Sequence, residues 1–468
     1  MLSDPLRVPA SNPSLLSLQP QDYSLLTDLY QLTMTACYAG EGLDQCWASF
    51  ELFARRLPAD FGYLIAMGLE QALEYLENLR FTPEQVTALQ SSGIFAGAPD
   101  RFWKLLETAH FSGDVWAVPE GTAVFANEPL LRVEAPLWQA QIVETYLLNA
   151  LNYQTLIATR AARLRDVAGA AATLLEFGTR RAFSPQGAIW AARAALAAGF
   201  NATSNVLAAL KLGCKPTGTM AHALVMALAA VEGSEVQAFQ AFHRYFPGAP
   251  LLIDTYDTIA AAQQLATKVQ IGEMELAGVR LDSGDLAALS QQVRQLLPQT
   301  PIFASGDLDE YRIAELQAAG ACIDGYGLGT QLVTGAPVNG VYKLVEIDGI
   351  PVMKEATGKT TYPGRKQIFR ESKNGQVLGD RLGLSTDAPE QATPLLQLVM
   401  HQGQRQVGRE SLQTIRDRTA QSLASLPPEV RQIQQPAPFS VTISPALQIL
   451  TERTQKQSHP GLNQQGKA

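Results

Sequence analysis

Cysteine is scarce in this sequence, which has four cysteines in 468 residues. Cys37, Cys46, Cys214 and Cys322 are scattered along the chain, with no CxxC pair and no spacing typical of zinc ligands. These positions argue against a disulfide framework and against a structural metal site. The sequence therefore predicts a reduced, cytoplasmic protein.

Long apolar runs and excess positive charge are also missing. No stretch of about 18 apolar residues occurs, and the N-terminus lacks a basic start followed by an apolar run, so we expect neither a membrane span nor an export signal. The net charge is -8 and the pI is near 5.3, which argues against general binding of nucleic acid or acidic membranes. An anionic ligand must therefore be held by local arginines and glycine loops.

The length and the 46% hydrophobic content exceed what one compact core usually holds, so we expect a large barrel-type domain and a second domain. Residues 1–20 and 456–468 are predicted to be flexible tails. Residues 21–140 are predicted to form a helical and sandwich-like domain, mostly helical from Asp22 to about Trp103 and then built of short antiparallel strands from Phe111 to Pro136.

A different rhythm, in which short apolar strands precede Ala- and Leu-rich helices, marks residues 141–334 as an α/β barrel domain. The expected strands are ATLLEF, a short one around CKPTG, PLLID, AGVRL, PIFAS and ACIDGYG. Such alternation favours right-handed βαβ units and a parallel sheet, either closed as a barrel or left open. Residues 335–455 again indicate strands and a helix, so the second domain is expected to be assembled from both flanks of the barrel.

A polar cluster follows each expected barrel strand directly. The clusters are GTRR (178–181), GTMAH (218–222), DTYDT (254–258), DSGD (282–285), SGDLD (305–309) and GLGT (327–330). The carboxyl ends of parallel strands form the ligand face, so these residues are expected to converge on one site. Ordinary polar loops and helix caps explain any one cluster, but they explain six rather poorly.

Two glycine turns in these clusters have the composition of phosphate cradles. Gly327 and Gly329 allow close approach of the backbone, and Thr330 adds a hydroxyl beside donor N–H groups. Ser305 and Gly306 have the same composition. A purely structural turn is an equally good interpretation of either segment taken alone.

The charged residues suggest an anionic ligand, with alternatives left open. Arg180 lies three residues after Phe177 and suits diphosphate or carboxylate recognition, or else a surface ion pair. Arg280 lies inside the apolar strand AGVRL, where a charge is expensive unless it meets an anion or a fixed carboxylate. Asp254 and Asp282 could hold Mg²⁺ through water or accept ribose hydroxyls, although two of the four aspartates in their clusters could be helix caps.

One of the five histidines, His222, stands directly after a turn, where an imidazole can be presented to a ligand. It could act as a proton carrier, a metal ligand or a nucleophile, or it could be structural. Tyr30 has an equally plain alternative as a helix aromatic that packs against the barrel.

Ordered motifs over nearly the whole chain carry a family resemblance. They include TDLYQLTMTACY, FELFARRLP, EFGTRRAFSPQGA, KPTGTMAHALVMA, LLIDTYDT, GVRLDSGDL and GYGLGTQLVT. In these motifs the chain resembles the nicotinate phosphoribosyltransferases, which belong to the type II phosphoribosyltransferases. The resemblance implies an irregular TIM-like α/β barrel with a second, sandwich-like α/β domain. It also implies a homodimer whose active site borrows residues across the interface.

The resemblance further implies the reaction of nicotinate with 5-phosphoribosyl 1-pyrophosphate to give nicotinate mononucleotide and pyrophosphate, coupled to ATP hydrolysis with Mg²⁺. This reaction would serve NAD biosynthesis by salvage of nicotinate. His222 would be the histidine that ATP phosphorylates. The other implied contacts are Tyr30, Thr219, Arg280 and Phe177 for nicotinate, Thr330, Gly329, Gly327, Arg180, Asp254, Asp282, Ser305 and Gly306 for the phosphoribosyl substrate, and Asp282 and Asp254 for Mg²⁺.

Three other functions remain as alternatives at this point. A nicotinamide phosphoribosyltransferase would differ in its preferred pyridine. A quinolinate phosphoribosyltransferase typically presents several basic residues to a dicarboxylate, and the tyrosine and GTMAH motifs argue against it. A non-catalytic binding protein should have lost part of the polar set, whereas His222, Arg280 and the aspartates are all present.

Overall fold

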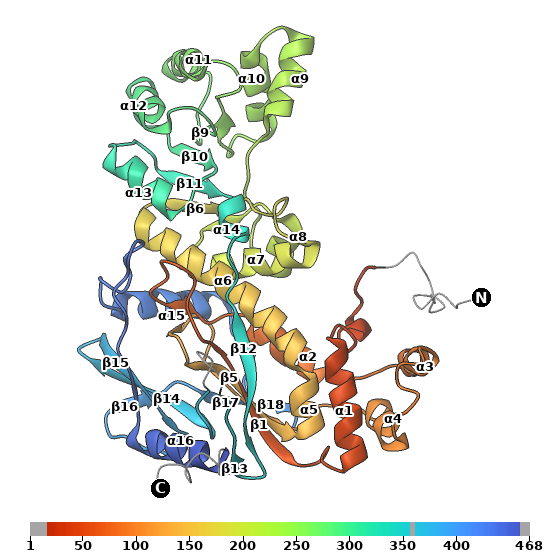
Figure 1. Ribbon diagram of the computed structural model, residues 1–468. Helices are drawn as coiled ribbons and strands as arrows, with labels where there is room; N and C mark the ends of the chain where they lie inside the picture. The colour runs from red at the N-terminus through yellow and green to blue at the C-terminus, as the bar shows by residue number, and fades with distance from the viewer. Residues whose placement is uncertain (1–15, 356–360, 459–468) are drawn as a thin grey trace, which may run out of the picture.

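A computed structural model of the chain describes residues 16–355 and 361–458. Figure 1 shows a parallel sheet surrounded by helices at one end, antiparallel sheets at the other, and one long helix between them. Within the described ranges, no helix is long and apolar enough to cross a membrane.

The parallel sheet has six strands, ordered β7-β6-β11-β10-β9-β8, and every neighbouring pair is parallel. The strands are β6 (Thr173–Glu176), β7 (Ala202–Thr203), β8 (Leu251–Leu252), β9 (Val279–Leu281), β10 (Ile302–Gly306) and β11 (Gly325–Leu328). The helices between them are α7 (Pro185–Ala197), α8 (Val206–Lys211), α9 (His222–Glu232), α10 (Glu235–Tyr245), α11 (Thr258–Gln270), α12 (Leu286–Leu296) and α13 (Glu310–Ala318). The expected irregular TIM-like α/β barrel is confirmed.

The strand expected around CKPTG is wrong, although the structure describes all of these residues. The segment runs without regular structure between the two edge strands of the sheet. The Thr217 N–H donates to the Thr203 carbonyl oxygen at 2.9 Å, and the Thr219 hydroxyl donates to the Pro250 carbonyl oxygen at 2.6 Å. Pro216 has no N–H to donate to a ladder, so the segment joins the edges without becoming a strand.

The second domain is built from both flanks of the barrel, as expected. Its larger sheet is ordered β13-β12-β1-β5-β3-β17-β18. The strands before the barrel are β1 (Trp47–Ala54), β3 (Asp114–Ala117) and β5 (Pro129–Pro136), and those after it are β12 (Gly340–Ile347), β13 (Ile350–Pro351), β17 (Gln397–His401) and β18 (Gln404–Arg405). A four-stranded sheet contains β16 (Ala392–Pro394), β14 (Lys366–Lys373), β15 (Gln376–Leu384) and β19 (Val441–Ile443), and a short pair contains β2 (Leu64–Ile65) and β4 (Ala123–Val124).

Strand β1 interrupts the region that was expected to be mostly helical. It is a central strand, because Leu52 lies opposite both Leu131 of β5 and Tyr342 of β12. Seven of its eight residues are buried, so the sequence lacks the alternation by which a half-exposed strand is recognised. The helices around it are α1 (Leu29–Glu41), α2 (Leu69–Glu77), α3 (Pro83–Ser91) and α4 (Asp100–Glu107).

Helix α6 (Glu144–Ala168) connects the two domains, as Figure 1 shows. Its 25 residues contain no Gly or Pro, and it stops at Gly169, which has a positive φ. The hydroxyls of Thr155 and Thr159 bond to the backbone of the β2 segment. The buried Arg163 pairs with Glu310 of α13 at 2.9 Å, so α6 is attached to both domains.

The remaining α-helices of the described residues are α5 (Leu137–Ile142), α14 (Thr330–Val333), α15 (Leu412–Ser425) and α16 (Pro445–Ser458), and a short 3-10 helix spans Pro20–Asp22. Helix α16 continues into the expected C-terminal tail of residues 456–468. Residues 459–468 of that tail, and residues 1–15 of the N-terminal one, lie outside the described residues.

Candidate active site

A cavity of about 280 Å³ lies at the carboxyl ends of β6, β9, β10 and β11. Its lining residues are Phe177, Arg180, Arg181, Arg280, Asp282, Ser305, Gly306, Asp307, Gly327, Gly329 and Thr330. All of them except Arg181 and Asp307 are among the site residues predicted from the sequence, and these two belong to the same clusters. Parallel topology therefore brings four of the polar clusters into one cavity, which we call the anion pocket.

The glycines of the anion pocket are required by close packing. A Cβ at Gly327 would lie 2.5 Å from Cε2 of Phe177, so the aromatic ring rests directly on the backbone of β11. Gly306 has φ of +109°, and a Cβ there would lie 2.8 Å from the Asp282 carbonyl oxygen. Glycine is therefore required at both positions, because any side chain there would collide with its neighbours.

Three arginines give the anion pocket its positive charge. Arg180 and Arg181 are exposed on the turn after β6, whereas Arg280 is half-buried on β9. One amino group of Arg280 donates to the Met220 carbonyl oxygen at 3.1 Å, while its Nε is buried without a partner. Burial lowers the pKa of Arg280 despite the opposing charges of Asp282 and Asp254. An anion in the pocket would supply the interaction that this guanidinium lacks.

The aspartates divide into two groups with different functions. Asp257 and Asp285 cap α11 and α12 by accepting backbone N–H groups, so these two are helix caps. Oδ2 of Asp254 accepts the Asp282 N–H at 2.9 Å and the Ser283 hydroxyl at 2.7 Å. Asp282 in turn accepts the Ser305 hydroxyl. Asp254 and Asp282 therefore form one hydrogen-bonded array along the strand ends.

This array fits a divalent cation only together with other oxygen donors. Oδ1 of Asp254 is buried and has no hydrogen-bond partner, and a carboxylate oxygen of this kind suits Mg²⁺. No group of three or more His, Cys, Asp or Glu side chains is gathered for a metal ion among residues 16–355 and 361–458. Phosphate oxygens and water would have to complete the coordination.

His222 and Thr219 lie beside the anion pocket and do not line it. His222 is the first residue of α9, and its Nδ1 is 3.1 Å from the hydroxyl of Thr255, the residue after Asp254. The Thr219 hydroxyl donates its hydrogen bond to the Pro250 carbonyl oxygen and not toward the anion pocket. The imidazole is therefore placed at the end of β8, next to the aspartate array.

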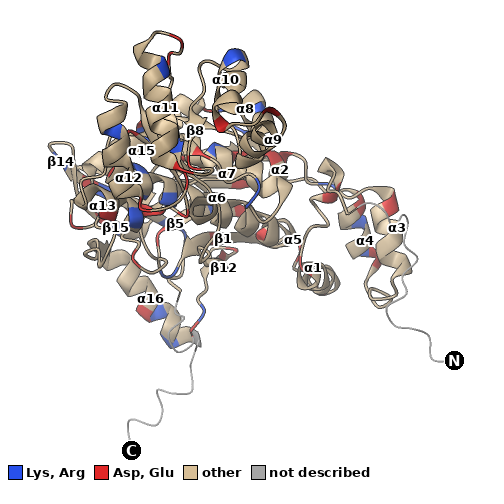
Figure 2. Ribbon diagram, turned by 90° about the horizontal axis from the view of Figure 1, so that it is seen from above, with Lys and Arg blue, Asp and Glu red and all other residues tan. Residues whose placement is uncertain are grey.

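Tyr30 is not brought to the anion pocket within one chain. It lies in the first turn of α1 and is 46% exposed. In both Figure 1 and Figure 2, α1 lies apart from helices α10, α11 and α12 beside the parallel sheet. Burial, followed by the charges of Glu144 and Asp28, raises the pKa of Tyr30; Glu144 begins α6 and Asp28 precedes α1, and neither lines the anion pocket.

Two glutamates near the site were not among the predicted residues. Glu176 is fully buried under the anion pocket, where it accepts the Thr203 hydroxyl and the Gly178 N–H, and burial raises its pKa. Its sequence signal was a charge at the end of the apolar strand ATLLEF. Burial, with the charges of Asp254 and Asp257, raises the pKa of Glu235 to about 7. Glu235 had no local signal, because only the fold brings α10 to these aspartates.

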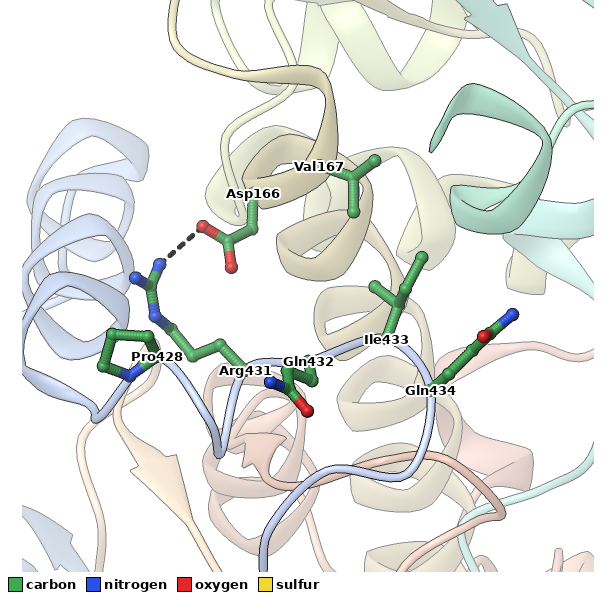
Figure 3. Close-up of a pocket in the computed structure, with 7 residues that line it drawn as sticks. All are labelled: Asp166, Val167, Pro428, Arg431, Gln432, Ile433 and Gln434. Carbon is green, nitrogen blue, oxygen red and sulfur yellow. Dashed lines mark hydrogen bonds and ion pairs between the residues drawn. The ribbon is translucent and has the colours of Figure 1, made fainter. Parts of the chain in front are cut away.

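A larger surface hollow of about 410 Å³ lies away from the strand ends, beside the C-terminal end of α6. Figure 3 shows its lining, in which Arg431 points at Asp166 across a 2.6 Å ion pair. The charges of this hollow already neutralise each other, so it is a weaker candidate than the anion pocket.

Comparisons with known proteins cover most of the chain. Residues 25–152, 172–314 and 385–451 match the N-terminal domain, the family and the C-terminal domain described as nicotinate phosphoribosyltransferase (NAPRTase). Nicotinate phosphoribosyltransferase pncB2 of Mycobacterium tuberculosis is 40% identical over 457 residues, which cover 94% of this chain and 96% of that protein. Nicotinate phosphoribosyltransferase of Bacillus subtilis is 43% identical over 380 residues, covering 77% of this chain and 76% of that protein.

A solved structure gives the same result for the fold. The crystal structure of human nicotinic acid phosphoribosyltransferase matches with a TM-score of 0.79 and 31% identity, over 92% of this chain and 99% of that chain. The similarity therefore extends through both domains and includes the elements that form the anion pocket.

Proposed function

Because the chain belongs to the nicotinate phosphoribosyltransferase family, we propose that it joins nicotinate to the ribosyl group of 5-phosphoribosyl 1-pyrophosphate. The products would be nicotinate mononucleotide and pyrophosphate, and the reaction would serve NAD biosynthesis from free nicotinate. The observation that supports this most directly is the anion pocket, where three arginines and two glycine turns meet at the strand ends.

The proposed reaction needs no general base, because the pyridine nitrogen of nicotinate already has a lone pair. This nitrogen attacks the anomeric carbon of the ribose, a C–N bond forms, and the C–O bond breaks with its electrons leaving on pyrophosphate. The protein has to align the reactants and stabilise the separating charges. Arg180, Arg181 and the Gly327–Thr330 turn would bind the phosphates, and Asp254 and Asp282 would accept ribose hydroxyls.

Recognition of the acid, as opposed to the amide, is assigned to Arg280. Its buried Nε has no partner, and a guanidinium can bind a carboxylate with two parallel hydrogen bonds. The ring of Phe177, on the backbone of β11, offers a face on which the pyridine can stack. Nicotinamide carries no charge and would gain less from Arg280, so nicotinate is the proposed substrate.

Coupling to ATP is assigned to His222. In the tautomer that carries its proton on Nδ1 and donates it to the Thr255 hydroxyl, Nε2 keeps the lone pair that attacks the γ-phosphorus of ATP. The N–P bond forms as the bond to ADP breaks, and later hydrolysis restores the imidazole. The phosphoryl group would add negative charge and acceptor oxygens beside the aspartate array. Mg²⁺ held at Asp254 with phosphate oxygens would neutralise the charge of the leaving pyrophosphate.

A homodimer is also part of the proposal. Tyr30 is exposed on α1 and lies outside the anion pocket of its own chain. If Tyr30 contacts nicotinate, a second copy of the chain has to provide it. The proposed site would then hold the pyridine between Phe177 of one protomer and the partner subunit's Tyr30.

The test is to mix the protein with 5-phosphoribosyl 1-pyrophosphate, Mg²⁺ and ATP, and to add nicotinate, nicotinamide or quinolinate separately. We expect pyrophosphate and nicotinate mononucleotide with nicotinate, and an ATP-dependent increase in the yield at low nicotinate. Absence of pyrophosphate with every pyridine, with and without ATP, would overturn the proposal and leave a binding protein. Preference for another pyridine would replace the substrate.

A further inference from the structure

Helix α14 begins at Thr330, the last residue of the Gly327–Thr330 turn, and it also packs against the turn that carries Arg180 and Arg181. A Cβ on Gly178 would collide with the side chain of Val333, so the turn that carries Arg180 and Arg181 lies directly on α14. The Phe177 N–H also donates to the Leu328 carbonyl oxygen at 2.7 Å. The two phosphate-binding halves of the anion pocket are therefore joined both by the β6–β11 pairing and by the packing of Gly178 against α14.

Two side chains of α6 donate hydrogen bonds to the backbone of α14 and of the residue that follows it. One amino group of Arg160 donates to the carbonyl oxygens of Gln331 and Thr334, at the end of α14. The Tyr153 hydroxyl donates to the Val333 carbonyl oxygen at 3.2 Å. Gly335 has φ of +130°, and a Cβ there would collide with the Arg160 guanidinium. The chain after α14 thus approaches Arg160 as closely as only glycine permits.

Helix α6, which carries Arg160 and Tyr153, is itself fixed to both domains. The Thr155 and Thr159 hydroxyls attach α6 to the β2 segment, and Arg163 attaches it to α13. Arg160 itself is half-buried, and its Nε has no partner, so its two carbonyl contacts have to offset an incomplete hydrogen-bond set. Asp309 and Glu310, at the start of α13, provide favourable charges near it.

We propose that Arg160 is a positioning residue for 5-phosphoribosyl 1-pyrophosphate, which places the Gly327–Thr330 turn and the arginine turn in register through α14. It does not line the anion pocket, so it acts through the backbone that it holds. The identity of the substrate rests on the proposed function. The effect of this positioning is on the affinity of the anion pocket for a diphosphate, which can be measured without turnover.

Arg165 is a matched control on the same helix. It is also half-buried, and it donates to the carbonyl oxygens of Gly199, Gly169 and Ala172 and to the side chain of Asn201. These partners lie at the amino end of β6, opposite to the anion pocket. Arg165→Met therefore removes a comparable set of arginine contacts without touching α14.

The experiment compares Arg160→Met, Arg165→Met and the unchanged protein by melting temperature, steady-state kinetics and calorimetric titration with inorganic pyrophosphate. For Arg160→Met we expect KM for 5-phosphoribosyl 1-pyrophosphate and Kd for pyrophosphate to rise about tenfold, with KM for nicotinate within about twofold. Arg165→Met should lower the melting temperature and leave KM for 5-phosphoribosyl 1-pyrophosphate and Kd for pyrophosphate unchanged. Tyr153→Phe, which removes a single hydroxyl, should raise this KM and this Kd about twofold to threefold.

Equal changes in the Arg160 and Arg165 variants, or no change in either, would assign Arg160 a purely structural role. If Arg160→Met does not fold, Arg160→Lys and Tyr153→Phe provide the same comparison, and unchanged pyrophosphate binding in both would overturn the inference. A protein that binds pyrophosphate but forms no nucleotide would contradict the proposed function alone. The pyrophosphate Kd of the variants would then still decide the role of Arg160.

Discussion

At the scale of single residues, the clearest chemical property of the site is an incompletely satisfied cation. Arg280 is half-buried, makes one hydrogen bond to Met220 and keeps a buried Nε without a partner. His222 has the complementary arrangement, because one ring nitrogen contacts Thr255 and the other is left for chemistry. These two residues carry the proposed substrate choice and the proposed ATP coupling, and they can be tested separately.

Replacing Arg280 by Gln should discriminate between the two pyridines. We expect kcat/KM for nicotinate to fall about 100-fold, because a charged hydrogen-bonded pair contributes roughly 1.5–3 kcal/mol. The value for nicotinamide should fall less than about tenfold. Steady-state kinetics with both substrates measure the ratio, and equal losses would rule out the carboxylate contact.

Replacing His222 by Ala should abolish phosphorylation by ATP. Protein incubated with γ-labelled ATP should carry an acid-labile phosphoryl group in the unchanged chain and none in His222→Ala. His243→Ala, on the neighbouring helix α10, is the matched control and should label normally. Labelling of His222→Ala at the level of the control would exclude His222 as the acceptor.

At the scale of elements, the sequence predicts which residues gather at the carboxyl edge of the parallel sheet. It misses features that depend on burial in the folded protein. The strand ends of ATLLEF, AGVRL, PIFAS and ACIDGYG meet in one cavity because parallel strands share a carboxyl edge. The segment WASFELFA conceals a strand because it is buried on both faces. The interpretation of CKPTG failed because of its proline, and Glu235 was missed because no local pattern reports its distant aspartates.

The α14 contact gives a prediction about glycine. Gly335→Ala has to displace the Arg160 guanidinium, so we expect it to weaken pyrophosphate binding in the same direction as Arg160→Met. Gly349→Ala, in the β12–β13 turn, also has a positive φ but meets nothing within 4 Å. It should cost only the backbone strain, about 1–2 kcal/mol. Thermal melts and pyrophosphate titrations of both variants check this, and identical behaviour would refute a specific role for Gly335.

The packing of the four-stranded sheet on β4 and β5 predicts a dependence of stability on pH. Burial, and then the adjacent Asp380 carboxylate, raises the pKa of Glu128 well above its ordinary value of 4.5. The folded protein therefore holds this proton more tightly than the unfolded chain does. As a result, folding stability falls as pH rises from about 4.5 toward the raised pKa.

Glu128→Gln removes this titration and keeps the size of the side chain. Relative to the unchanged protein, its free energy of unfolding should rise with pH by up to ~1.4 kcal/mol per unit within that window. Urea unfolding between pH 5 and about 8 measures the difference. The exposed Glu107→Gln is the control, and a pH-independent difference for Glu128→Gln would show that its carboxyl titrates normally.

At the scale of the whole molecule, one chain brings together most of the proposed site but leaves Tyr30 outside it. Sequence motifs report residue types without reporting which copy of the chain supplies them. Tyr30 is exposed on α1, and α1 lies apart from the helices beside the parallel sheet (Figure 1). If the proposed homodimer forms, two chains with different lesions can rebuild one intact site.

This arrangement predicts complementation between Tyr30→Ala and Arg280→Ala. We expect each variant alone to have low activity. A heterodimer purified through two different tags should recover about half of the unchanged activity, because one of its two sites receives both native residues. Activity no greater than the average of the two variants would show that Tyr30 does not serve a site in another copy.

The two edge strands of the parallel sheet, β7 and β8, affect how the barrel can move. Strands β7 and β8 share no ladder, and the Thr217 and Thr219 contacts span the gap between them. Breaking a few hydrogen bonds costs far less than opening a paired strand, so this line is where the barrel can separate locally without unfolding. His222 and the Gly327–Thr330 turn follow different strands of the sheet. Such local opening would change the distance between His222 and the Gly327–Thr330 turn while the structure around each of them stays intact.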